Sequence, residues 1–280
     1  MRTYHQIKDL RAHLRVSWQS GRVIGFVPTM GALHDGHRSL IRKARTECDE
    51  VVVSVFVNPT QFGPQEDYSK YPRTLEADSR MAQEMGVDAM FAPPAEVIYP
   101  FGPDATVEVG PLTTHLEGAG RPGHFRGVTT VCAKLFCIVQ PRYAYFGMKD
   151  YQQYRVVERM VADLHMGLSV VPVPTVREAD GLAMSSRNAY LSPEHRATAT
   201  CLYQALNQAA TLHGAGERDA AKLREAMHAR LSVERDVEIV YADVADAQTL
   251  EPVGAVAGAA VLLGAIRLGS TRLIDNVVLP

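Results

Sequence analysis

Apolar residues follow two alternating patterns along the first 175 residues. Runs that are apolar at nearly every position, such as residues 22–29 and the valine-rich 51–58, are typical of strands buried on both faces of a parallel sheet. Between these runs the apolar residues recur at helical spacing, as Leu40, Ile41 and Ala44 do. Alternating strands and helices predict right-handed crossovers and a doubly wound parallel sheet.

The remaining elements of this half follow the same alternation. Ligands of such sheets bind at the carboxyl ends of the strands, where "TMGALHDGH", "NPTQF" and "GMKDYQQ" all fall. We predict further strands at 87–93, 144–147 and 168–174, helices at 37–50, 74–86, 128–139 and 150–165, and an irregular Pro- and Gly-rich stretch at 93–127.

The pattern changes near Val176, where a polar segment precedes a different set of elements. We predict a Rossmann-like domain at residues 1–176 and a smaller C-terminal α+β domain at residues 177–280. In the second domain we predict helices at 193–212 and 220–231, followed by strands at 237–244, 259–269 and 271–279.

Composition and charge exclude several classes of protein. A formal net charge of −2 gives no basic bias, so a nucleic-acid partner is not indicated. We find no apolar segment long enough for a membrane span and no apolar core of a signal peptide near the N-terminus. The four cysteines form no CxxC pair, and we interpret Cys132 and Cys137 as core residues. These features favour the reducing cytoplasm.

Two histidines, His34 and His37, lie where the first predicted strand is followed by a helix. Their spacing can serve a metal ion, but the sequence offers no obvious third and fourth ligand. They can also be solvated loop residues. The phosphate-binding alternative has a mechanism, because a Gly-containing turn into a helix presents N–H groups and a partial positive charge to an anion. We expect the amides from Met30 to His37 to contribute, with Gly36 allowing close approach.

Two further segments carry cations and hydroxyls suited to phosphate. In "LAMSSRN", Arg187 can form bidentate bonds to phosphate beside the hydroxyls of Ser185 and Ser186. Lys149 stands at a predicted helix start, where a cation is locally unfavourable, and this placement favours a functional role over a solvated one.

Five motifs together resemble one enzyme family. "PTMGALHDGH", "FVNPTQF", "EGAGRPGHFRGV", "FGMKDYQQ" and "DGLAMSSRN" are similar, in order and spacing, to the pantothenate synthetase (pantoate–β-alanine ligase) family of the HIGH/KMSKS nucleotidyltransferase superfamily. The resemblance implies that pantoate attacks ATP to give pantoyl adenylate and pyrophosphate, and that β-alanine then displaces AMP. It also implies Mg²⁺ bound with ATP, no protein metal ligand that can be named, and a homodimer.

The resemblance carries residue roles over to this sequence. His37 matches the catalytic histidine, and we expect His34, Lys149 and Arg187 to act with it. Gln61 and Gln153 match the pantoate-binding glutamines, with Gln61 also touching β-alanine. The predicted ATP-binding residues are Met30, Gly31, Ala32, Leu33, His34, Asp35, Gly36, His37, Gly147, Met148, Lys149, Asp150, Val176, Met184, Ser185, Ser186 and Arg187.

Some details depart from the pattern or stay open. At the position of Met148 the family usually has Gln or Glu. Methionine removes any side-chain hydrogen bond at this position. We expect Phe62 and Pro28 to line the apolar side of the pantoate pocket. Residues 63–74 and 117–127 are either closing loops over the adenylate or surface connections. A nucleotidyltransferase that leaves the nucleotide on its product, an aminoacyl-tRNA synthetase fragment and a non-catalytic nucleotide sensor are alternative functions.

Overall fold

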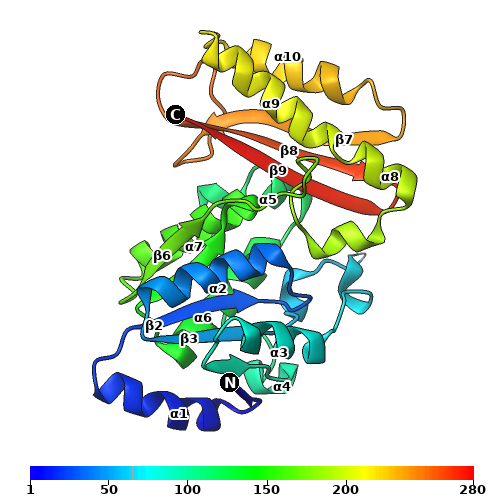
Figure 1. Ribbon diagram of the computed structural model, residues 1–280. Helices are drawn as coiled ribbons and strands as arrows, with labels where there is room; N and C mark the ends of the chain where they lie inside the picture. Colours follow the sequence, from blue (N-terminus) through cyan, green and yellow to red (C-terminus); the bar gives the residue numbers. More distant parts are fainter. Residues whose placement is uncertain (65) are drawn as a thin grey trace. The chain divides into compact units, whose positions relative to one another are not determined.

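Six parallel strands form the larger sheet of the computed structural model, which describes residues 1–64 and 66–280 (Figure 1). Their order across the sheet is β1-β4-β3-β2-β5-β6. The order changes direction between β2 and β5, so the carboxyl ends of these two strands border the crevice where such sheets bind ligands. The strands are β1 (Arg2–Tyr4), β2 (Ile24–Thr29), β3 (Glu50–Val55), β4 (Ala89–Phe91), β5 (Tyr143–Gly147) and β6 (Ser169–Val173).

Helices connect these strands. Short 3₁₀ turns are η1 (Pro59–Gln61), η2 (Asp67–Ser69), η3 (Pro111–Thr113) and η4 (Met148–Asp150). The α-helices are α1 (Ile7–Gln19), α2 (Asp35–Glu47), α3 (Leu75–Glu84), α4 (Ala95–Ile98), α5 (Glu117–Gly120), α6 (His124–Val139) and α7 (Tyr151–Asp163).

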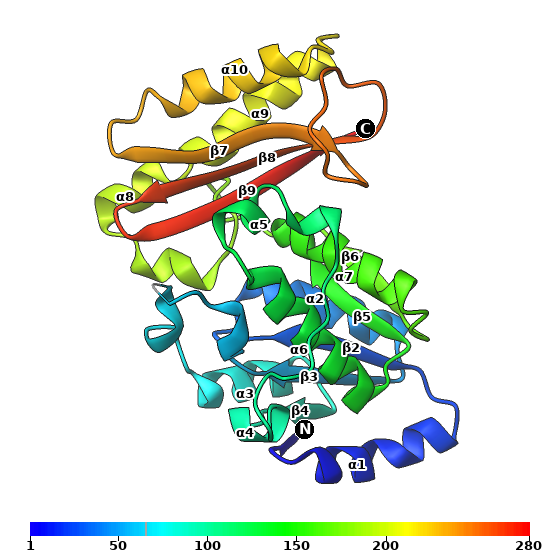
Figure 2. The same ribbon diagram turned by 180° about the vertical axis from the view of Figure 1, so that it is seen from behind.

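The sheet is covered on both faces, as its valine-rich strands predict. On the face shown in Figure 1, Ile41 of α2 and Ala82 of α3 pack against a buried cluster that includes Val27 and Val53. On the opposite face, seen in Figure 2, α6 covers β2 and β5. There the ring of Phe136 lies 6.3 Å from Phe26 and 6.4 Å from Phe146, in edge-to-face contacts.

A second unit follows, built on a three-stranded antiparallel sheet. The first unit comprises residues 1–148 and 153–174, and the second comprises 149–152 and 175–280. Helices α9 and α10 pack on one face of the second sheet, where Leu206, Met227 and Ile266 are fully buried. Its elements are η5 (Ser186–Tyr190), α8 (Pro193–Thr198), α9 (Cys201–Gly214), α10 (Ala220–Leu231), β7 (Val237–Asp246), β8 (Ala260–Leu268) and β9 (Thr271–Leu279).

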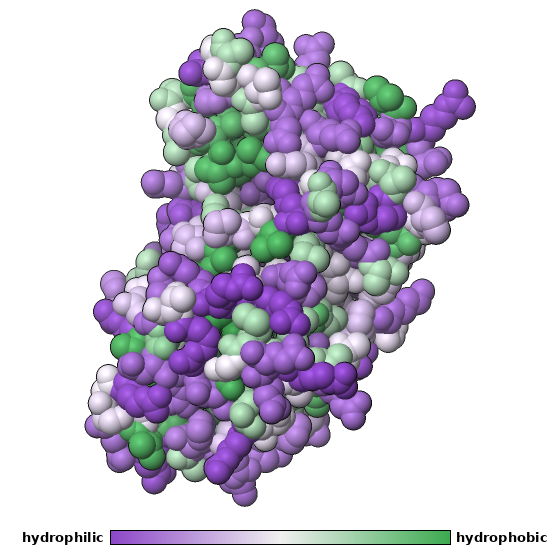
Figure 3. All heavy atoms as spheres, viewed as in Figure 1, coloured by the Kyte–Doolittle hydropathy of each residue, from purple (hydrophilic) through white to green (hydrophobic). Residues whose placement is uncertain are grey.

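The predicted fold class is confirmed: a Rossmann-like doubly wound parallel sheet with a smaller α+β unit. Hydrophilic side chains cover most of the face in Figure 3, with apolar ones in small separate groups. Exposed large apolar side chains such as Val16, Phe101 and Val233 lie far apart in the sequence. Among the residues that the structure describes, no helix combines the length and apolarity that a membrane crossing needs.

Three local predictions are wrong. The stretch 93–127 is not irregular throughout, since it contains α4, η3, α5 and the first turn of α6. The predicted helix 193–212 is two helices, α8 and α9, separated at Ala199 and Thr200. Cys137 is exposed while Cys132 is buried, because five helical positions rotate a side chain by about 140°. Residues 63–74 include residue 65, which lies outside the described residues.

Candidate active site

The turn after β2 has a left-handed backbone. Gly31 and Ala32 have φ angles of +87° and +50°. A Cβ atom on Gly31 would lie 2.9 Å from Val55 Cγ1 and 3.0 Å from Asp78 Oδ2. Both the conformation and the space therefore require glycine at this position. The turn places His34 at the N-cap of α2.

His34 and His37 close the start of α2 by a reciprocal pair of hydrogen bonds. The N–H of Gly36 donates to His34 Nδ1 at 3.1 Å, and the N–H of His34 donates to His37 Nδ1 at 3.2 Å. Because a backbone N–H can only donate, each Nδ1 carries no proton and the ring proton lies on Nε2. Both rings thus have an Nε2–H group, a hydrogen-bond donor that suits a phosphate oxygen.

A buried carboxylate occupies two amides of the same turn. The N–H of Ala32 donates to Asp78 Oδ2 at 3.1 Å, and the N–H of Leu33 donates to Asp78 Oδ1 at 2.8 Å. Asp78 lies on α3, is 2% exposed and also accepts from Thr74 Oγ1 at 3.2 Å. The N–H groups of Gly31, His34 and Gly36 likewise donate to acceptors within the turn. Phosphate binding by the amides from Met30 to His37 stays a prediction.

Gln61 lies beside this turn. It ends η1 after β3, is 8% exposed, and its Nε2 lies 3.1 Å from Met30 Sδ. Its Oε1 accepts from Asn58 Nδ2 at 3.1 Å. The structure thus brings a predicted substrate glutamine next to the predicted nucleotide turn. Gln153, the other predicted substrate glutamine, lies partly buried in the first turn of α7.

Phe62, the residue after Gln61, belongs to a group of aromatic rings. The ring of Phe62 lies 5.4 Å from that of Tyr68 and 5.9 Å from that of Tyr71, with edge-to-face geometry. Pro28 lies partly buried on β2. Both residues predicted to form an apolar lining thus belong to the same unit as Gln61.

Part of the stretch 117–127 supports the turn that carries Gln61. His124 Nδ1 lies 2.8 Å from the Gln61 carbonyl, and His124 Nε2 lies 3.0 Å from Arg121 Nη1. A carbonyl only accepts and a guanidinium only donates, so the proton is on Nδ1 and the ring is neutral. Burial, together with the Arg121 cation, lowers the pKa of His124 to about 4.

Gly127 allows helix α6 to touch the same turn. A Cβ atom there would lie 2.4 Å from the Thr60 carbonyl oxygen and 2.6 Å from Gln61 Cα. Gly127 and His124 are both buried, so this part of the stretch is not an exposed surface connection. Gly118 and Gly127, two of the glycines that made the stretch look irregular, serve close backbone packing instead.

Lys149 follows β5 in the turn η4. Its side chain is 19% exposed, and its Nζ lies 3.5 Å from Asp150 Oδ1, at the outer limit of hydrogen bonding. Asn276 Nδ2 donates to the Lys149 carbonyl at 2.9 Å, which fixes the turn. Gly147 and Met148, directly before it, form the carboxyl end of β5 and the start of η4. A largely buried cation with one long carboxylate contact is suited to an anionic ligand.

Val176 and Met184 lie opposite each other in a hairpin of the second unit. The N–H of Met184 donates to the Val176 carbonyl at 3.0 Å. The hairpin is closed by a bridge between Arg177 and Ala183. Arg177 also forms a bidentate ion pair with the buried Asp275, with Nη2 2.9 Å from Oδ1. Two of the residues that are predicted to contact ATP in this unit, Val176 and Met184, thus lie in one hairpin.

Ser185, Ser186 and Arg187 stand at the start of η5. The Ser185 hydroxyl oxygen accepts from the Arg187 N–H at 3.3 Å, which makes Ser185 the N-cap. All three side chains are partly buried. Two hydroxyls and a guanidinium within three residues can bind several oxygens of one phosphate group.

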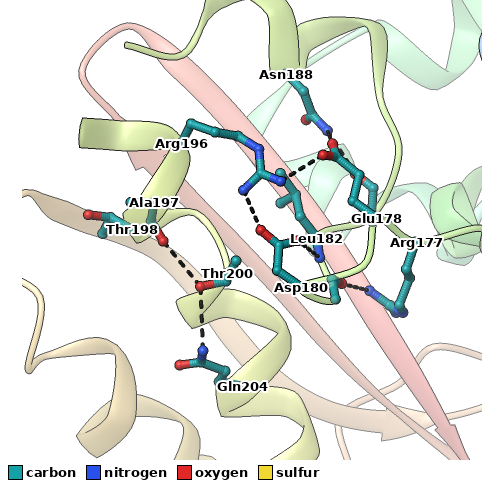
Figure 4. Close-up of polar contacts among 12 residues, drawn as sticks. Arg177, Glu178, Asp180, Leu182, Asn188, Arg196, Ala197, Thr198, Thr200 and Gln204 are labelled. Carbon is teal, nitrogen blue, oxygen red and sulfur yellow. Dashed lines mark hydrogen bonds and ion pairs between the residues drawn. The ribbon is translucent and has the colours of Figure 1, made fainter. Parts of the chain in front are cut away.

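An ion-pair network stabilises this segment (Figure 4). Arg196 of α8 donates to Glu178 Oε2 at 2.6 Å and to Asp180 Oδ2 at 2.7 Å, and in the figure its guanidinium points between the two carboxylates. Asn188 Nδ2, one residue after Arg187, donates to Glu178 Oε1 at 3.1 Å. These bonds therefore connect the hairpin directly to α8, and they connect η5 to α8 through Glu178.

Sequence reasoning missed Asn58, Asp78 and Arg196. Asn58 had a local signal, because an Asn before a Pro after a strand is typical of an N-cap with Pro at N1. Asp78 had none, since it lies 46 residues from Ala32. Over residues 1–64 and 66–280, no group of three or more His, Cys, Asp or Glu side chains could hold a metal ion.

Comparison with known proteins gives one family. Residues 2–278 match the family described as pantoate-beta-alanine ligase. A pantothenate synthetase of Geobacter sulfurreducens is 53% identical over 279 residues, which cover 100% of this chain and 99% of the relative. One of Pelotomaculum thermopropionicum is 54% identical over 273 residues, 98% of this chain and 97% of the relative.

Solved structures agree. The crystal structure of pantothenate synthetase from Thermus thermophilus has a TM-score of 0.95 and 50% identity, and the match covers 99% of both chains. Pantoate-beta-alanine ligase from Francisella tularensis, in complex with beta-gamma ATP and beta-alanine, has a TM-score of 0.83 and 35% identity over 99% of this chain and 97% of that one. The chain therefore belongs to the pantoate–β-alanine ligase family.

Proposed function

We propose that this chain joins pantoate to β-alanine at the expense of ATP, through a pantoyl adenylate, and releases pyrophosphate, AMP and pantothenate. The observation that carries the proposal is the family match over residues 2–278. The enzyme is a ligase that forms an amide bond.

In the first step a pantoate carboxylate oxygen attacks the α-phosphorus of ATP, and the bond to pyrophosphate breaks. A carboxylate is already a nucleophile, so the step needs positioning and neutralised phosphate charge rather than a general base. We assign the Nε2–H groups of His34 and His37 to phosphate oxygens. The ammonium of Lys149 binds the α-phosphate as its charge develops.

The leaving group and the nucleoside take the remaining contacts. Ser185, Ser186 and Arg187 bind the pyrophosphate, with Arg187 supplying the positive charge. Val176 contacts adenine through its backbone, and Asp150 accepts a bond from the ribose or from a magnesium-bound water. With these assignments, every phosphate group of ATP has a cationic or hydrogen-bond-donating partner.

Pantoate is bound by Gln61 and Gln153, and Phe62 and Pro28 face its gem-dimethyl group. In the second step the amine of β-alanine, in its unprotonated form, attacks the activated carbonyl carbon. The bond from that carbon to the AMP oxygen breaks, and the attacking nitrogen loses a proton. Glutamine amides suit this pocket because they bind a carboxylate without neutralising it as a nucleophile.

Three other features belong to the proposal. ATP binds as its Mg²⁺ complex, and the ion keeps much of its water, so the proposal needs no protein ligand to it. The chain works as a homodimer, which sedimentation of the purified protein would test. It works in the cytoplasm, as the cysteine pattern predicted.

The test is pyrophosphate–ATP exchange with Mg²⁺ and pantoate in the absence of β-alanine. We expect pantoate-dependent exchange, and AMP with pantothenate once β-alanine is added. Lys149→Ala is expected to lower the exchange rate by roughly 10²–10³ while ATP still binds, because it removes one donor to the transition state. Exchange that does not depend on pantoate would contradict the assignment of the substrate.

A further inference from the structure

Two buried amides, Asn58 and Gln61, form a chain of hydrogen bonds at the carboxyl end of β3. Asn58 is 1% exposed and Gln61 is 8% exposed. Buried amides must be satisfied at both ends, since an unpaired buried polar group is costly. The partners of Asn58 therefore determine which end of Gln61 is available to a ligand.

Two backbone groups fix the orientation of the Asn58 amide. Its Nδ2 lies 3.1 Å from the Gly127 carbonyl, which can only accept. Its Oδ1 lies 3.4 Å from the Thr60 N–H, which can only donate. Exchanging the nitrogen and oxygen of this amide would set like groups against each other at both contacts. The NH₂ group thus faces α6, and the oxygen faces the turn η1.

The Asn58 oxygen receives a stronger bond from a tyrosine. The Tyr99 hydroxyl donates to Asn58 Oδ1 at 2.8 Å and lies 3.2 Å from Thr60 Oγ1. The Thr60 hydroxyl donates to the same oxygen at 3.0 Å. Tyr99 follows α4, and burial raises the pKa of its hydroxyl, so the group keeps its proton and remains a donor. The Lys134 ammonium lies 5.0 Å from the centre of the Tyr99 ring, which holds the ring from one side.

The orientation of the Asn58 amide determines the orientation of the Gln61 amide. Because Asn58 Nδ2 is a donor, the Gln61 atom 3.1 Å away must be its oxygen, and Gln61 Nε2 is the other end of the amide. That nitrogen lies 3.1 Å from Met30 Sδ, a weak acceptor that a substrate oxygen can replace. His124 holds the same residue by its backbone carbonyl.

We propose that Tyr99 is a positioning residue: its bond to Asn58, the shortest that Asn58 accepts, strengthens the orientation in which Gln61 meets substrate only as a hydrogen-bond donor. The group that Gln61 recognises is then an oxygen acceptor, a carboxylate or hydroxyl oxygen. A donor-only group such as an ammonium is rejected there, because two N–H groups would oppose each other. The inference rests on the proposed function in one respect, the placement of Gln61 in the pantoate site.

The first variant is Tyr99→Phe, which removes only the hydroxyl. We expect the KM for pantoate to rise about 3- to 10-fold, the equivalent of one hydrogen bond, with the KM for ATP unchanged. The matched control is Tyr143→Phe on β5, in the same unit, which should leave both values unchanged. Thermal unfolding of each variant confirms that the fold is kept.

A double-mutant cycle with Gln61→Leu separates positioning from general support. Without the Gln61 amide there is nothing to orient, so Tyr99→Phe should cause no further rise in the KM for pantoate. Two effects that multiply, or an equal rise in both KM values, would overturn the inference. If Gln61→Leu raises the KM for pantoate and Tyr99→Phe does not, the pantoate site stands and the inference fails. If Gln61→Leu itself leaves that KM unchanged, the placement of Gln61 is wrong and the inference falls with it.

Discussion

Replacing Asp78 by asparagine tests whether a buried carboxylate shapes the nucleotide turn. Asparagine keeps the size but sets an NH₂ group against one of the two N–H groups of Ala32 and Leu33. One bond to a charged acceptor, worth about 1.5–3 kcal/mol, is lost, and the other becomes a neutral bond worth about 1 kcal/mol. Relief from burying a charge offsets part of this loss. We expect the free energy of unfolding to fall by about 2–4 kcal/mol.

The assay has two readouts. Urea unfolding measures the lost stability, and pyrophosphate–ATP exchange measures the KM for ATP. Each 1.4 kcal/mol that the turn geometry loses corresponds to about a tenfold rise in that KM, and we expect a rise of about this size. Glu76→Gln, an exposed acid on the same helix α3, is the control and should change neither readout.

The outcomes are distinct. A variant of normal stability and normal KM for ATP would refute the reasoning, since it would mean that the carboxylate does not hold the turn. A stability loss with an unchanged KM would restrict Asp78 to the fold.

Three further perturbations probe the supports of the site. Gly127→Ala should lower the free energy of unfolding by at least about 2 kcal/mol, because its methyl group meets Thr60 backbone; Gly214→Ala, with no atom within 4 Å, should stay within about 0.5 kcal/mol in the same urea titration. Between pH 6.5 and 4 the unfolded chain binds a proton at His124 that the folded chain does not bind, so the free energy of unfolding should fall with falling pH by up to about 3 kcal/mol. His124→Gln should remove this part of the pH dependence of stability. Arg196→Gln should raise the KM for ATP about 3- to 10-fold and leave that for pantoate unchanged in steady-state kinetics.

Much of the fold could be predicted from periodicity because both sides of the larger sheet are buried. The valine-rich run at 51–58 has no polar face, and only a strand covered on both sides tolerates that. The pattern was least informative where glycine serves packing. Gly127 permits a backbone contact with Thr60, and nothing in the local sequence distinguishes that use from flexibility.

Site residues that are close together in the sequence could be predicted, and those that come from distant segments could not. His34 and His37 lie within four residues, so their spacing alone singled out this turn as a candidate ligand site. The cap that the two rings form was not predicted. Asp78 and Tyr99 act on residues about 40 positions away, and such pairs depend on which strands become neighbours. The use of the Ala32 and Leu33 amides by a carboxylate of the chain itself could not be read from the turn.

The three residues of β1 have a consequence for how this protein tolerates damage at its N-terminus. Arg2–Tyr4 pair with Ala89–Phe91 of β4, all three of which are fully buried, and His5 Nδ1 lies 2.6 Å from the Ala92 carbonyl. Without this short strip, β4 would become an open, apolar sheet edge that can pair with another chain. Proteolytic loss of residues 1–5 should therefore reveal itself as aggregation, long before it alters the chemistry of the molecules that remain dispersed.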